Sequence, residues 1–247
     1  MRRYLTALLL LCATAFPLAA EQRPRPLGWA LDAMRGGDFD AAERIAERDG
    51  AVARDVIVWH RLRNAQGDYA QITDFLKRRP DWPGMDYLRR RSEPVVIEQS
   101  DDEIIAFFEG MAAQTPMGVL AHARALTAKG LTGPAQANLV LAWRTMPMDT
   151  LEQAAFLADH AELLKPHHDA RLDAMVWERE YDEARQMYGI ASKGTEQAAE
   201  ARIAFYRRLD SAVQTYEDLP AALKVTGGVN HARFEWRIRS GREQDAK

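Results

Sequence analysis

Cysteine is almost missing from this sequence, because Cys12 is the only one among 247 residues. It lies within residues 1–20, which have the pattern of a signal peptide, so the chain expected after cleavage contains no cysteine. Disulfide bonds, cysteine-based zinc sites and thiol nucleophiles are therefore excluded for the cleaved chain. A chain of this length can bury enough apolar surface to fold without disulfides.

Long apolar runs are also missing after residue 20. Residues 1–20 combine a charged start, a short apolar stretch and small residues at the end, which predicts export and cleavage near Ala20. The apolar stretch is too short to span a bilayer. Lipidation of Cys12 is the alternative, but Leu11 precedes it at a position where a lipoprotein signal has a small residue. We therefore expect a periplasmic protein without a membrane anchor.

The sequence has no strong excess of charge of either sign. It contains 33 Lys and Arg residues against 36 Asp and Glu residues, which gives a net charge of −3 at pH 7. This balance gives no reason to expect nucleic acid as a partner. A glycine-rich nucleotide loop, a zincin motif and a nucleophile elbow are all missing. The sequence therefore nominates no catalytic residue, no cofactor and no metal.

Short amphipathic helices account for nearly all of the pattern that is present. The one strand-like fragment, residues 94–97, is too short and isolated to found a sheet. Several helix starts carry capping residues, which satisfy the free N–H groups of the first turn. These starts are Ser100 with Glu103, Thr115 followed by Pro116, and Asp149 with Glu152. Pro134 is expected to open a further helix.

Residues 75–84 predict a rigid corner between two helices. Pro80 ends the first helix, since it has no N–H group and restricts the residue before it. Asp81 is the expected N-cap of the second helix, and Pro83 is expected in its first turn. Trp82 is interpreted as a wedge between neighbouring helices, with ligand stacking as the alternative.

Three helix entrances resemble one another, at residues 37–41, 67–70 and 180–184. Each has an aromatic residue next to acidic residues, followed by alanine, and such entrances recur in stacks of helix pairs. Their spacing is irregular, which indicates a degenerate TPR-like solenoid and not a regular array. We therefore predict an all-α fold for residues 21–247, a superhelical stack of short helix pairs with a concave surface.

One cluster resembles a set of metal ligands: His160, His167, His168 and Asp169. Pro166 separates its members onto two helices, and two adjacent histidines point their rings apart. Helix capping and surface exposure are therefore the preferred interpretation, and a metal site is the alternative.

Tryptophans and arginines supply the remaining candidates. A sugar-stacking groove is the alternative to core packing for Trp59, Trp143, Trp177 and Trp236. Several groups of basic residues are interpreted as solvated helix faces or members of ion pairs. Contact with an anionic wall polymer or with an adjoining domain is the alternative. These groups are residues 77–79, residues 89–91, and Arg233, Arg237, Arg239 and Arg242.

Local patterns spread over most of the cleaved chain carry a family resemblance. In chain order they are Trp59-x-x-Leu62, Gly67-Asp68, Phe75-Leu76-x-x-x-Pro80-Asp81-Trp82-Pro83-Gly84, Arg91 with Glu93, Pro116-x-Gly118, Ala121, Ala125, Gly130, Ala142-Trp143, Asp149-x-x-Glu152, Leu163-Leu164, Arg171-x-Asp173-x-x-x-Trp177, residues 201–204, Pro220 and Arg233-x-x-Trp236-Arg237. In their order and spacing they resemble the N-terminal superhelical region of the soluble lytic murein transglycosylases.

The resemblance implies a role in peptidoglycan turnover in the periplasm. Members of that family cleave the β-1,4 bond between N-acetylmuramic acid and N-acetylglucosamine without water and leave a 1,6-anhydromuramoyl end. One glutamate in a separate lysozyme-like C-terminal domain acts first as general acid and then as base. That glutamate opens a Glu-Ser motif, and a Gly-Leu-Met-Gln segment follows it downstream.

This chain contains neither motif and ends at Lys247, where the family has a further helix pair. We therefore expect the scaffold portion of such a transglycosylase, incomplete at its C-terminal end and inactive on its own. Glycan strands would be bound through the catalytic domain of the family. The alternative is an exported helical-repeat adaptor that binds periplasmic proteins through its concave face.

Overall fold

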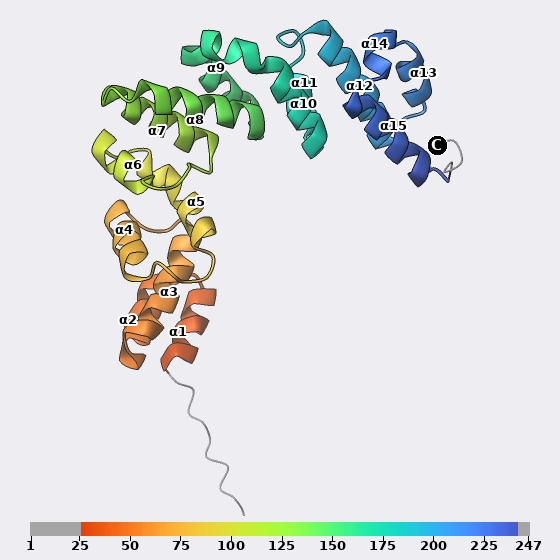
Figure 1. Ribbon diagram of the computed structural model, residues 1–247. Helices are drawn as coiled ribbons and strands as arrows, with labels where there is room; N and C mark the ends of the chain where they lie inside the picture. Colours follow the sequence, from red (N-terminus) through yellow and green to blue (C-terminus); the bar gives the residue numbers. More distant parts are fainter. Residues whose placement is uncertain (1–25, 242–247) are drawn as a thin grey trace, which may run out of the picture. The chain divides into compact units, whose positions relative to one another are not determined.

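The chain is all-helical over residues 26–241, the part described by the computed structural model (Figure 1), and the predicted signal peptide lies outside it. No strand occurs among these residues, so the predicted all-α class is confirmed. The elements are α1 (Pro26–Arg35), α2 (Phe39–Ala46), η1 (Glu47–Asp49), α3 (Ala51–Arg63), α4 (Tyr69–Arg78), α5 (Met85–Val96), α6 (Asp101–Phe107), α7 (Pro116–Ala128), α8 (Thr132–Thr145), α9 (Thr150–Leu164), η2 (Lys165–His167), α10 (His168–Glu178), α11 (Tyr181–Gln186), α12 (Lys193–Arg207), α13 (Ala212–Glu217), α14 (Ala221–Lys224) and α15 (Gly227–Arg239).

Residues 26–61 belong to a first compact unit, in which α1 packs on α2. Its core contains small side chains, among them Ala30 and Ala42, which let the two helices approach closely, and the larger Ile57 from α3. Asp38 caps α2 as its position predicts, because its carboxylate accepts the backbone N–H of Ala41 at 2.9 Å. Arg61 adds an ion pair with Glu43 at 3.0 Å.

The second unit continues through residues 62–241, and its helices pack mainly on their near neighbours in sequence. The pairs in contact include α6 with α7, α7 with α8, α8 with α10, and α12 with α15 (Figure 1). This neighbour-on-neighbour packing is the pattern of helical repeat proteins, in which no single pair can bury its apolar face alone. The predicted stack of short helices is therefore confirmed.

The predicted caps occur where the sequence places them. Ser100 and Asp149 both form reciprocal capping boxes with the glutamate three residues later. Thr115 accepts the backbone N–H of Gly118 at 3.0 Å, and Pro116 occupies the first position of α7. Pro134 differs slightly from expectation, because α8 begins at Thr132 and the proline lies within its first turn.

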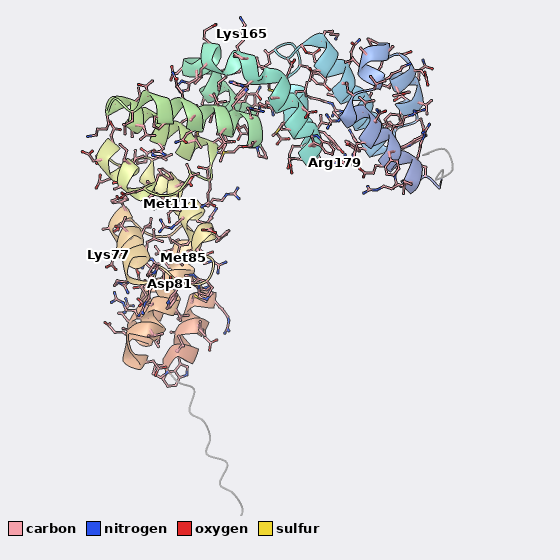
Figure 2. All side chains as sticks on the ribbon, in the orientation of Figure 1. Lys77, Asp81, Met85, Met111, Lys165 and Arg179 are labelled. Carbon is pink, nitrogen blue, oxygen red and sulfur yellow. The ribbon has the colours of Figure 1, made fainter. Side chains whose placement is uncertain are left out.

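Two predictions about the corner after α4 are wrong. The helix α4 ends before Pro80, but α5 begins only at Met85 with Gly84 as its N-cap, so Asp81 is not the cap and Pro83 lies before the first turn. The reason is the backbone of Gly84, which has φ of +67°, a left-handed conformation that glycine adopts without strain. Trp82 packs edge-on against Phe75 with ring centroids 5.5 Å apart, as a wedge would. Figure 2 labels Asp81 and Met85 in this region.

Residues 94–97, the strand-like fragment expected to be too short to found a sheet, are helical up to Val96, because α5 runs through Pro94. Val96 is fully buried on the packed face of the helix, so tertiary packing overrides the local preference of β-branched residues. Pro94 has no N–H group to donate to the carbonyl oxygen one turn earlier in the helix. Because Pro94 is exposed, that carbonyl oxygen lies within reach of water.

A buried carboxylate joins α5 to the start of α7. Glu93 is only 1% exposed and accepts the backbone N–H groups of Gln114 at 2.6 Å and Thr115 at 2.8 Å, together with the Thr115 hydroxyl. Burial raises the pKa of Glu93, against the opposing effect of these hydrogen bonds. A Cβ atom at Gly118 would overlap the Glu93 carboxylate, so only glycine fits beside it.

The change Gly118→Ala is expected to destabilise the protein by about 1–3 kcal/mol, since it displaces a buried carboxylate from its hydrogen-bond donors. The measurement is the free energy of unfolding in urea. Gly133→Ala is the matched control, because this helical glycine has open space around it and alanine there should be neutral or slightly stabilising. In a Glu93→Ala background the effect of Gly118→Ala should shrink, and strict additivity would contradict the joint.

Candidate functional site

The joint between α8 and α10 is built on a fully buried arginine. Arg171 donates from Nη1 to the carbonyl oxygens of Trp143 at 2.7 Å and Met146 at 2.8 Å, at the C-terminal end of α8. Its guanidinium also lies 4.7 Å from the centroid of the Trp143 ring. A cation at the negative end of a helix is favourable. Burial lowers the pKa of Arg171 to about 10, so it remains charged at neutral pH.

Beside this joint, α8 and α10 line an open groove of about 670 Å³. Each helix contributes five residues at positions i, i+3, i+4, i+7 and i+8, which lie on one helical face. The lining residues are Ala137, Val140, Leu141, Arg144 and Thr145 from α8, and Ala170, Asp173, Ala174, Trp177 and Glu178 from α10. Small side chains are interspersed with a few large ones, among them Leu141 at 61% exposure and Trp177 at 43%.

The indole of Trp177 is held by neighbours from α12 and α15. The guanidinium of Arg202 lies 5.2 Å from the ring centroid, and the ring of His231 lies 4.8 Å away at 55°. Arg202 is itself 3% exposed and forms an ion pair with Asp173. Gly228 leaves room for the Arg202 side chain, because a Cβ atom at residue 228 would come within 2.9 Å of the guanidinium carbon. Trp177 is thus exposed but fixed in orientation.

The contacts continue from His231 to the end of α10. Tyr206 hydrogen-bonds to Nδ1 of His231 at 3.2 Å, and the guanidinium of Arg179 lies 3.2 Å from the centroid of the Tyr206 ring. Arg179 also donates to Glu235 of α15 at 2.8 Å. Figure 2 labels Arg179, which follows the last residue of α10. These contacts fix the C-terminal half of α10 against α12 and α15.

The three candidate tryptophans of the second unit do not line one groove. Trp143 is completely buried and acts as a core wedge, close to Phe156 and His168. Trp236 is half-buried against Phe205 at 5.3 Å, and Trp59 is also half-buried. Trp177 alone of the three lines the α8/α10 groove. Core packing is therefore the better interpretation for the others.

The candidate histidine cluster is divided between core and surface roles. His168 is buried with its ring 5.4 Å from that of Trp143, and burial lowers its pKa. Asp169 accepts the backbone N–H and the hydroxyl of Ser192, both at 2.7 Å, and so anchors the start of α12. Over residues 26–241, no three side chains of His, Cys, Asp or Glu are placed to hold a metal ion.

Many of the candidate basic residues have partners within the protein. Their contacts are ion pairs of Arg78 with Asp74 and of Arg239 with Glu235, and ring contacts of Arg79 with Trp82, Arg89 with Phe107, and Arg233 with Tyr216. Arg242 lies outside the described residues. Ion pairs therefore account for the charge of Arg78 and Arg239, and the other three arginines lie against aromatic rings within the protein.

The lining residues offer stacking and hydrogen bonding, which is the chemistry of binding. Leu141, Arg144 and Glu178 belong to this face, and sequence reasoning did not single them out. The signal that could have found them is the shared spacing of the two helices, together with the exposure of residues opposite the buried Trp143 and Arg171.

In the described part of the chain, no helix is long and apolar enough to cross a membrane.

These features define the class of the protein as an all-α stack of short helices with charged joints. Comparisons with family models, with curated proteins and with solved structures gave no match.

Replacing Arg171 by methionine is expected to lower the free energy of unfolding by about 2–4 kcal/mol, because two carbonyl groups lose their donor. Chemical denaturation measures this difference. The matched control is Arg144→Met on the exposed face of the neighbouring helix, which should stay within about 0.5 kcal/mol of the original protein. Equal effects of the two changes would show that Arg171 does not fix the joint.

Stability is expected to decrease in mild acid, because two histidines are buried in the neutral form. Burial lowers the pKa of His122 and of His168 below the ordinary value of 6.5. The unfolded chain therefore binds more protons than the folded chain below that pH, and the free energy of unfolding falls as pH falls. Each histidine contributes at most about 1.4 kcal/mol per pH unit.

The measurement is urea denaturation at a series of pH values between neutrality and mild acid. His122→Gln and His168→Gln should each show a shallower loss of stability on acidification than the original protein. An unchanged pH dependence in both variants would contradict the assignment of neutral, buried imidazoles.

Proposed function

We propose that this chain is the scaffold portion of a periplasmic lytic transglycosylase that acts in peptidoglycan turnover. The observation that carries the proposal is that residues of the family-like patterns pair with one another in space. Glu93 accepts hydrogen bonds beside Gly118, Arg171 binds the carbonyl oxygen of Trp143, and Asp173 pairs with Arg202.

These pairings matter because the partners lie far apart in the sequence. A residue that resembles a pattern by chance has no reason to contact another such residue on a different helix. Here Trp143 and Arg171 join α8 to α10, and Asp173 and Arg202 join α10 to α12. The patterns therefore act together as joints of the helical stack, which supports a shared architecture with the family they resemble.

The joints also define what this chain contributes. Arg171 and Arg202 are almost fully buried, and Glu93 is 1% exposed, so these residues serve architecture and not the chemistry of bond cleavage. In the proposed role the chain supports and positions, while the general acid of the reaction belongs to a separate lysozyme-like domain.

A scaffold that helps to position glycan strands next to the catalytic domain has weak contact with them of its own, so the purified protein is expected to co-sediment with isolated peptidoglycan sacculi without clearing a sacculus suspension. The measurements are the bound fraction after centrifugation and the release of 1,6-anhydromuropeptides by chromatography. An active lytic transglycosylase serves as the positive control for release, and a helical protein of similar size and charge serves as the control for sedimentation.

Two outcomes would contradict the proposal in different ways. Strong clearance with 1,6-anhydro products would overturn the expectation that the chain is inactive on its own. No retention on sacculi, combined with capture of defined periplasmic proteins, would favour the exported helical-repeat adaptor.

A further inference from the structure

The groove between α8 and α10 has the features of a carbohydrate site, and we propose that it binds a glycan strand of N-acetylated amino sugars, with one sugar ring stacked on Trp177. The choice of sugar rests on the proposed function, while the site itself rests on the geometry. The proposal places glycan contact on the helical stack itself, apart from any catalytic domain.

The first step is the fixed orientation of the indole. Trp177 retains 43% exposure although Arg202 and His231 both contact it. An exposed tryptophan normally loses side-chain freedom when a ligand binds, which weakens the complex. Here that freedom is already restricted by the packed neighbours, so the ring presents a ready apolar platform. Sugars have an apolar face of C–H groups that fits such a platform.

The second step is the shape of the groove. Its volume of about 670 Å³ lies within the range of small-ligand sites and suits a short oligosaccharide. Ala137, Ala170 and Ala174 keep the lining shallow and apolar, which provides space for the methyl group of an acetamido substituent. The hydrogen bonds of Arg171 to the C-terminal end of α8 fix the spacing of the two helices, so the groove is preformed.

The third step is the charge around the platform. Arg144, Asp173 and Glu178 bring charges of both signs to the groove, and Asp173 is paired with Arg202. A strongly anionic or cationic ligand would meet a like charge on one side. A neutral ligand rich in hydroxyl and amide groups can use both the donors of Arg144 and the acceptors of the carboxylates. This balance favours a neutral sugar over a charged peptide or polymer.

The direct experiment is titration of the purified protein with chitotetraose, a neutral β-1,4-linked oligomer of N-acetylglucosamine. Saturable binding is expected, followed by tryptophan fluorescence and by isothermal calorimetry. Cellotetraose, which has the same linkage without acetamido groups, should bind more weakly. No saturable binding of chitotetraose up to millimolar concentration would overturn the proposal.

The site is assigned with variants of two kinds. Trp177→Ala should weaken binding about tenfold or more, whereas Trp29→Ala, which removes a similarly exposed indole from the first unit, should leave it unchanged. Because Trp177 also contacts packed neighbours, Leu141→Lys provides a second test at a side chain that is 61% exposed, with Leu151→Lys as its control. Thermal melting confirms that each variant is folded. Equal binding by the two members of both pairs would overturn the assignment.

The same variants separate this inference from the proposed function. Retention of folded Trp177→Ala and Leu141→Lys on sacculi at the original level would overturn the groove as the glycan site and leave the scaffold proposal standing. Binding of chitotetraose through Trp177, without retention of the original protein on sacculi, would support the sugar site and contradict the scaffold proposal.

Discussion

The guanidinium of Arg171 is the interaction on which the middle of the structure depends. Short helices have few residues with which to bury apolar surface, so apolar contact alone defines their relative positions weakly. A buried cation that donates to the carbonyl groups of Trp143 and Met146 adds direction to that contact. If α10 slid along α8, two carbonyl groups and one charge would lose their partners in the interior, and each loss would be unfavourable.

The same principle recurs along the chain with different chemistry. Glu93 uses an acceptor group to fix the start of α7, where N–H groups are free. Arg202 uses a donor group to tie α12 to α10 and then supports the indole of Trp177. Architecture and the proposed binding surface are thus connected, because the residue that joins two helices also orients the exposed ring.

Local features could be predicted from the sequence, whereas the joints could not. The caps at Ser100, Thr115 and Asp149 depend on neighbours within three residues, so a short pattern contains all the necessary information. At the corner, the end of α4 and the wedge position of Trp82 follow from the sequence, whereas the start of α5 depends on the left-handed conformation of Gly84. The groove was missed because its two faces come from separate helices, and a single tryptophan gives no sign of what lies opposite. Which buried arginine meets which carbonyl likewise depends on the packed fold.

The close approach of Gly118 to Glu93 has a consequence for divergence of the sequence. A side chain at residue 118 requires space that the carboxylate occupies, and a shorter residue at 93 would leave the N–H groups of Gln114 and Thr115 without their acceptor. Neither position can drift freely while the other is retained. In diverging descendants the two positions should therefore change together or not at all, and such covariation would mark the α5–α7 joint from sequences alone.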